Sequence, residues 1–272
     1  MYKGDIRTME IHTDMHIHTT LSCCCHDPEQ TLENIAAKMK EKGFRKIGIC
    51  DHFWRNPAVK PNGFYAPQTG DSILSLKKSA DNSGFPLQVL IGAEAEMVAP
   101  GVFGVDRAFK EQVDFIALPT DHFHITDFVK QPPDDSPRGI AAHMLEFFIS
   151  GAKSGLADVL VHPLLPLGKS MEQYDRIIES LSDAELFDAW SIAAENHAAV
   201  EINTACLFCG RYAKMFSRDT IRRTHELAKK AGCKFTIGSD SHESGGFIGY
   251  EEAAAFCGEV GITEADFSPF MF

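Results

Sequence analysis

The sequence lacks long apolar runs and any excess of positive charge. No apolar run reaches the roughly 18 residues that a membrane helix needs, and residues 1–7 do not form the apolar core of a secretion signal. Lys and Arg number 26 against 38 Asp and Glu, which gives a formal net charge of −12. Duplex nucleic acid and anionic membranes attract clustered positive charge, so we expect neither as a partner. We expect a cytoplasmic protein that acts on a small molecule.

Internal repeats, low-complexity tracts and linkers are also missing from the sequence. A chain of 272 residues with 44% hydrophobic content can bury one large core, so residues 1–272 are predicted to form a single domain. The eight cysteines are scattered and accompany no secretion signal, which favours reduced thiols over disulfides. The twelve histidines are the feature that remains to be explained.

Short apolar runs alternate with helical patterns, and this alternation predicts a parallel α/β fold. One helix is predicted from Asp27 as its N-cap, with Pro28 at its first position and Gly43 just past its end. Another is predicted between Ser217 and Gly232. The predicted strands span residues 11–17, 46–50, 87–91, 115–118, 159–161, 200–202 and 235–237.

Histidines and carboxylates follow most of these predicted strands. His16 and His18 lie two residues apart on one strand, so both side chains leave the same face, as two ligands of one metal must. In a parallel barrel the carboxyl ends of the strands gather on one rim, where the active sites of such folds lie. Loops rich in Pro, Gly and Asp, at residues 53–70 and 122–137, are expected to cover that rim. The other groups at strand ends are Asp51-His52, Glu94, Asp121-His122, His162 and Asp240-Ser241-His242.

Each of these residues has an ordinary structural explanation when it is considered alone. Asp51 and Asp240 could cap the helices that follow them, and Glu94 could form a salt bridge. A single histidine at a strand end is usually a hydrogen-bonded structural residue. So many titratable groups on one rim would nevertheless be electrostatically costly without cations. The set as a whole therefore predicts a metal site.

The same residues make the chain resemble the polymerase and histidinol phosphatase (PHP) superfamily, and its phosphatase branch in particular. The matching motifs lie between residues 14 and 242 and follow the family's order. They are His16-Ile17-His18-Thr19, His26, Asp51-His52, Gly92-Ala93-Glu94, His162-Pro163, Glu201-Ile202-Asn203-Thr204 and Gly238-Ser239-Asp240-Ser241-His242. The resemblance implies a distorted seven-stranded (β/α) barrel with three metal ions at its rim.

The resemblance also implies how the ligands divide among three divalent ions. One ion would be held by His16, His18, Glu94 and Asp240. Glu94 would bridge to a second ion, held also by His162 and a residue near His122. The third ion would be held by His26, His52 and His242. Mixed imidazole and carboxylate ligands suit Zn, Fe or Mn, and ligand type does not choose among them.

Two assignments among these ligands have close competitors. His122 is the predicted ligand after the fourth strand, with Asp121 and His124 as the alternatives, because the strand's alternation no longer fixes direction there. Asp121 would then orient a neighbouring ligand. In the run that leads to His26, the adjacent residues 23–25 point in different directions, so only His26 is predicted to bind metal. The histidines away from strand ends are predicted to be surface or supporting residues: His12, His143, His197 and His225.

The predicted activity is hydrolysis of a small phosphate monoester, with histidinol phosphate as one candidate. Two metals roughly 3.5 to 4 Å apart can generate hydroxide near neutral pH and hold the attacking and leaving oxygens. Glu94, Asp240 and His242 are the predicted catalytic residues. The predicted substrate contacts are Arg211, Arg55, Glu201 and Asn203, with Arg211 replacing an arginine that the family usually has at the Phe208 position. The alternatives are hydrolysis of a phosphodiester or amide on the same metals, and a non-catalytic module that metal only stabilises.

Overall fold

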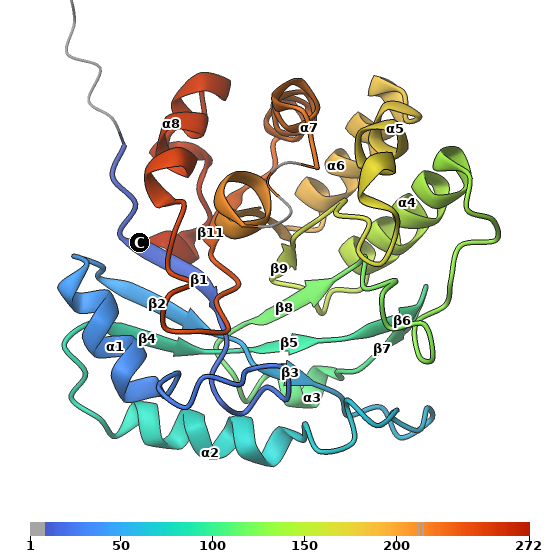
Figure 1. The fold of residues 1–272 in the computed structure, drawn as a ribbon. Coiled ribbons are helices and arrows are strands. Elements are labelled where there is room, and N and C mark those ends of the chain that lie inside the picture. Colours follow the sequence, from blue (N-terminus) through green and yellow to red (C-terminus); the bar gives the residue numbers. More distant parts are fainter. Residues whose placement is uncertain (1–8, 211–212, 214) are drawn as a thin grey trace, which may run out of the picture.

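Parallel strands form the centre of the computed structural model, which describes residues 9–210, 213 and 215–272 (Figure 1). The strands are β1 (Thr13–Ile17), β2 (Lys46–Ile49), β3 (His52–Phe53), β4 (Gln88–Ile91), β5 (Ala93–Ala95), β6 (Met97–Ala99), β7 (Val102–Phe103), β8 (Ile116–Pro119), β9 (Val159–Val161), β10 (Ala199–Asn203) and β11 (Phe235–Gly238). One parallel sheet has the order β1-β2-β4, and the other has the order β11-β10-β9-β8-β5-β3. A separate antiparallel hairpin pairs β6 with β7.

The two parallel sheets meet at both edges. β3 follows β2, and β5 follows β4, after breaks of one or two residues, so the chain passes directly from one sheet into the other. At the opposite edge the His18 N–H donates to the Ser241 carbonyl (3.0 Å), and the Asp240 N–H donates to the His16 carbonyl (2.8 Å). These bonds bring the end of β11 beside β1. The α/β class is confirmed, whereas closure as a seven-stranded barrel stays a prediction.

Helices cover the outside of the strands. The first two lie below the sheets in Figure 1, and the later ones, from α4 onward, lie along the opposite side. Their bounds are α1 (Leu32–Glu41), α2 (Gly70–Asp81), α3 (Arg107–Lys110), α4 (Pro137–Lys153), α5 (Tyr174–Glu179), α6 (Asp183–Glu195), α7 (Arg218–Lys230) and α8 (Tyr250–Val260). Within the described residues, no helix is long and apolar enough to cross a membrane.

A second, smaller core fills the space between the strands. Its buried members are Met15, Cys50, Phe115, Ala117, Val159, Val161 and Ala199. Phe115 fits there because Gly92 has no side chain: a Cβ at Gly92 would lie 2.5 Å from the Phe115 carbonyl oxygen. Most of these apolar residues come from early or middle positions of their strands. The later positions are therefore left for the histidines and carboxylates.

The predicted strands and one of the two predicted helices are confirmed. Ser217 caps α7 by accepting a hydrogen bond from the Thr220 N–H. The prediction for α1 was wrong at its start, because Thr31 rather than Asp27 is the N-cap. The Asp27 carboxylate instead accepts hydrogen bonds from the Glu29 N–H (2.9 Å) and the distant Ser244 N–H (2.7 Å).

Candidate metal centre

A cavity of about 1270 Å³ opens where the strands of both sheets end. Side chains from several strand ends line it, so residues far apart in the sequence converge on one space. They include His52, Glu94, His122, His162, Asp240 and His242. The adjacent loops contribute further lining residues, among them Asn62, Phe64 and Asp127. The two predicted loops thus border the cavity.

Hydrogen bonds fix the ring orientations of His16 and His18, both of which are fully buried. Nδ1 of His16 lies 2.7 Å from Glu201 Oε1, an acceptor, so this nitrogen carries a proton. The Ser22 hydroxyl donates to Asp51 (2.7 Å) and therefore accepts from Nδ1 of His18 (3.0 Å). Each ring consequently directs its Nε2 atom at the cavity, and the second nitrogen of each is held by a carboxylate or hydroxyl, as in known metal sites.

The two Nε2 atoms lie 3.0 Å apart, and both point at Asp240. Asp240 Oδ1 is 3.4 Å from Nε2 of His16 and 3.2 Å from Nε2 of His18. Burial raises the pKa of Asp240, but His16 and the hydrogen bond with His18 outweigh it and hold the pKa well below its usual range. Two ring nitrogens and a carboxylate oxygen at these distances need a cation between them, either a proton or a metal ion.

Glu94 links this group to a second pair of histidines. Its Oε1 lies 3.1 Å from Nε2 of His162 and 3.7 Å from Nε2 of His122. Nδ1 of His162 donates to Asp121 Oδ1 (2.9 Å), and Nδ1 of His122 donates to Glu96 Oε2 (2.8 Å). Burial raises the pKa of Glu94, but His52 and neighbouring imidazoles outweigh burial and lower it well below its usual range. The ionised carboxylate therefore faces ring nitrogens on both sides.

The predicted alternatives after the fourth strand are separated in the structure. His122 is buried and faces Glu94, whereas His124 is exposed and its ring centroid lies 5.0 Å from that of His122. Asp121 is buried behind His162, and its Oδ2 accepts the Leu165 N–H (3.0 Å). Its carboxylate thus orients His162 from the side away from Glu94. The choice of His122 as the metal ligand stays a prediction.

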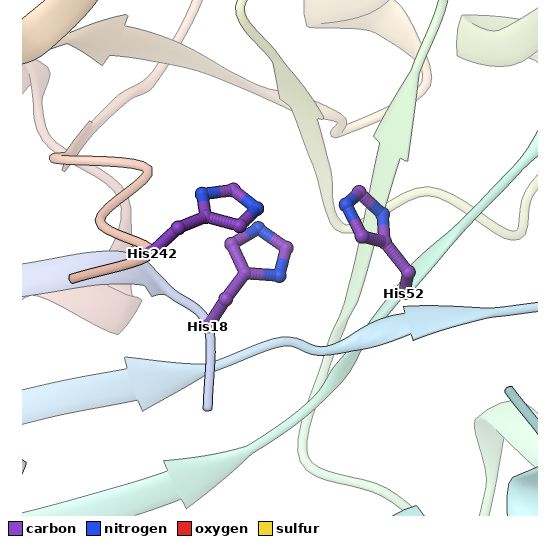
Figure 2. Close-up of side chains that lie close together, drawn as sticks. All are labelled: His18, His52 and His242. Atoms are coloured by element: carbon purple, nitrogen blue, oxygen red, sulfur yellow. The ribbon is translucent and has the colours of Figure 1, made fainter. Parts of the chain in front are cut away.

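A third group of histidines lies nearer the cavity mouth. Figure 2 shows His18 between His52 and His242, and one nitrogen of each ring lies within 4.8 Å of the other two. The rings of His18 and His242 stack with centroids 4.0 Å apart. Nδ1 of His52 is buried without a hydrogen-bond partner, although Glu94 Oε2 lies 2.9 Å away. A buried ring nitrogen in this state is what a metal ligand looks like without its ion.

His26, predicted as the third ligand of this group, does not join it. Its side chain is exposed, and it is not among the described residues that line the cavity. Cys24, which the sequence pattern did not predict to bind metal, lines the cavity together with His52 and His242. Burial raises the pKa of the Cys24 thiol, but the interactions with His242 and His52 outweigh burial and lower the pKa to about 6.

Glu201 and Asn203, predicted as substrate contacts, lie behind the histidines in the structure. Both are buried, and the two oxygens of Glu201 are occupied by the His16 ring and by the His162 N–H (2.6 Å). Asn203 donates to Glu201 Oε2 (3.1 Å) and accepts from the Cys206 N–H (2.9 Å). Glu201 therefore supports the ligands from behind, and Asn203 supports Glu201.

The predicted arginines do not supply a described cation at the cavity. The exposed Arg55 packs its guanidinium over the Phe109 ring, 5.9 Å from the centroid, and is not among the residues that line the cavity. Arg211 lies outside the described residues. Lys169, which the sequence pattern did not single out, lines the cavity and pairs with Asp135 (3.2 Å) on the neighbouring loop. Its position in a Pro/Gly-rich turn after β9 was the available signal.

The donor set fits divalent transition metals. Imidazole nitrogens and carboxylate oxygens suit Zn, Fe and Mn. The buried nitrogen of His52 is unsatisfied, and the facing Nε2 atoms of His16 and His18 require a cation. His and Glu side chains here form overlapping groups that could each hold an ion.

Comparison with known proteins identifies relatives of this arrangement. A family model described as the PHP domain matches residues 14–239. A protein named probable phosphatase from Shewanella sp. (strain MR-4) is 27% identical over 248 residues, which are 90% of this chain and 82% of that protein.

Two solved structures share the fold at low sequence identity. Histidinol phosphate phosphatase from Lactococcus lactis subsp. lactis Il1403, complexed with zinc, L-histidinol and phosphate, gives a TM-score of 0.55 at 17% identity. The match covers 93% of this chain and 94% of that one. A candidate histidinol phosphatase from Listeria monocytogenes gives a TM-score of 0.57 at 16% identity, covering 86% of this chain and 97% of that one.

Proposed function

The chain belongs to the PHP domain family, and we propose that it is a metal-dependent phosphatase of small phosphate monoesters. One observation carries the proposal: a buried, ionised carboxylate, Glu94, is surrounded by imidazoles. The nearest distances from its oxygens are 2.9 Å to His52, 3.1 Å to His162, 3.4 Å to His18, 3.7 Å to His122 and 3.8 Å to His16. A carboxylate with ligands on both sides is suited to bridge two ions.

We propose three ions, of Zn, Fe or Mn. When bound, divalent ions at such sites acidify water and neutralise charge on phosphoryl oxygens. The chain's own residues have separate tasks. Glu201, Ser22, Asp121 and Glu96 hold the rings in the tautomers that leave one nitrogen free for metal. Asp240 and Glu94 stay ionised and offset the charge of the ions.

Lys169 is proposed to contact the phosphate. Of the described residues that line the cavity, it is the one with a Lys or Arg side chain, and 13% of that side chain is exposed. Its partner Asp135 is largely exposed, so this ion pair is screened by solvent and easily exchanged for a phosphate. Arg211 stays a second candidate, because it directly follows Gly210, a residue of the cavity wall.

Histidinol phosphate is proposed as one candidate substrate rather than the substrate. The Lactococcus lactis protein binds L-histidinol and phosphate, which supports including it. The Phe208 position, where the family usually has an arginine, is apolar here. Its ring packs on Phe256, with centroids 5.3 Å apart, and beneath the Arg218 guanidinium. The chain therefore has no guanidinium at this position to hold a phosphate. Which alcohol part of the monoester the cavity wall recognises has to be found by screening.

The proposal is tested by stripping the protein with a chelator, reloading it with Zn, Mn or Fe, and measuring phosphate release from a panel of monoesters that includes histidinol phosphate. We expect stripping to abolish release and reloading to restore it. Phosphodiester and amide substrates belong in the same panel. Turnover of one of those without any monoester, or no turnover in any loaded form, would overturn the proposal in favour of another hydrolase or a non-catalytic module.

A further inference from the structure

We propose that Cys24 is a metal ligand, which joins His52 and His242 around the ion nearest the cavity mouth. This inference rests on the proposed metal-dependent function and deepens it. The loop after β1 was expected to supply the imidazole of His26 to this ion. In the proposal it supplies the thiolate sulfur of Cys24 instead.

The loop after β1 directs Cys24, and neither of its cysteine neighbours, at the cavity. The Cys25 N–H donates to the Ser22 carbonyl (2.9 Å), which closes a turn with Cys23 and Cys24 at its centre. Cys23 is exposed, and the Cys25 thiol donates to the His242 carbonyl (3.0 Å). Cys24 lines the cavity together with His52 and His242. Of the three adjacent thiols, the middle one is therefore available to the cavity.

The two histidines beside Cys24 already have the form of metal ligands. Nδ1 of His242 donates to the Asp240 carbonyl (2.9 Å), so Nε2 is the ring nitrogen that could bind an ion. The His52 side chain is only 10% exposed, and its Nδ1 has no hydrogen-bond partner. Because Cys24, His52 and His242 line the same cavity, a single ion between them could reach the sulfur and one nitrogen from each ring.

Contacts on both sides of His26 hold the loop and oppose its replacing Cys24 at the cavity. On one side, the Cys25 thiol is bonded to the His242 carbonyl. On the other, the Asp27 carboxylate accepts the Ser244 N–H (2.7 Å). Both contacts attach the loop to the segment after β11, and His26 lies exposed between them. Turning its ring inward would require the loss of at least one of these anchors.

A thiolate at this position predicts a preference among metals. Thiolate is a soft ligand that favours Zn(II) and Co(II) over Mn(II) and Mg(II), whereas imidazole and carboxylate are less selective. The thiolate also brings a negative charge that a histidine would not. Two imidazoles and one thiolate would supply three protein ligands, the number that catalytic zinc sites use.

The test is Co(II) reconstitution of the metal-free full-length protein, read by absorption and elemental analysis. We expect a thiolate-to-cobalt charge-transfer band in the near ultraviolet in the parent protein. In Cys24→Ser the band should disappear and the cobalt content should fall by one ion per chain. Cys23→Ser, a matched change at the exposed neighbour, and His26→Ala should both keep the band and the full cobalt content.

Alkylation supplies a second readout that does not depend on the Cys24 variant folding. In the parent, iodoacetamide should label Cys24 in the metal-free protein and not in the zinc-loaded protein, while Cys23 is labelled in both. A parent that binds cobalt without a charge-transfer band, or whose Cys24 is alkylated equally with and without zinc, would overturn the Cys24 assignment alone. A parent that binds no metal at all would overturn the proposed function as well.

Discussion

Replacing Glu94 with Gln removes a negative charge from the centre of the site while keeping the side chain's shape. The two Glu94 oxygens face different groups: Oε1 lies 3.1 Å from His162, and Oε2 lies 3.4 Å from His18 and 2.9 Å from His52. An interaction with a charged group contributes about 1.5 to 3 kcal/mol. The loss of one such interaction from each oxygen is then about 3 to 6 kcal/mol, or about 10²- to 10⁴-fold in kcat/KM.

The assay is kcat/KM on the best monoester of the panel, with metal content measured on the same sample. Glu185→Gln is the matched control, since it makes the same chemical change at a carboxylate that pairs with Arg138 on the surface, and we expect it to leave kcat/KM within error. Denaturant unfolding of both metal-free variants checks that each is folded. A Glu94→Gln protein that keeps more than half of the parent's kcat/KM would refute the bridging role.

Three further predictions concern single side chains. His122→Ala should lose one metal ion per chain. Asp121→Ala should keep the ions but bind them about 10- to 100-fold more weakly, as measured by competition with a chelating dye. Loss of an ion from Asp121→Ala but not from His122→Ala would reverse the assignment. Lys169→Ala should lower kcat/KM by about 1.5 to 3 kcal/mol while the exposed Lys153→Ala does not, and equal effects would contradict a phosphate contact. Burial lowers the pKa of His225 from 6.5 to about 4, so the unfolded chain takes up this proton first as the pH falls. The parent should therefore lose about 2 kcal/mol more unfolding free energy between pH 7 and pH 5 than His225→Leu, and parallel losses in urea titrations would contradict this.

The positions of the strands were predictable from local sequence, because each strand is a short apolar run that has to be buried. The convergence of strand-end residues followed from the parallel connection rule, which requires no knowledge of the loops. His16 and His18 illustrate this, since two-residue spacing on a strand places both side chains on one face whatever the surroundings. His225 is not a surface residue, because its ring is buried beside Phe235 and Phe256.

The residue that the loop after β1 turns toward the cavity could not be predicted from local sequence. Which residue of the loop reaches His52 is decided by contacts with the segment after β11, more than 200 residues away in the chain. The sequence pattern therefore selected His26, whereas in the fold His26 is exposed and Cys24 lines the cavity. The same limit applies to Glu201, because alternation placed it on the side of Asn203 but did not reveal that the His16 ring occupies its carboxylate.

The central claim is that the strand-end histidines and carboxylates hold divalent ions around Glu94. Anomalous diffraction from crystals of zinc-loaded protein, recorded above and below the zinc absorption edge, tests it most directly. We expect one peak among His16, His18 and Asp240, one beside His122 and His162, and one between His52 and His242, with Glu94 shared by the first two. Full zinc loading without a peak bound to Glu94 would contradict it.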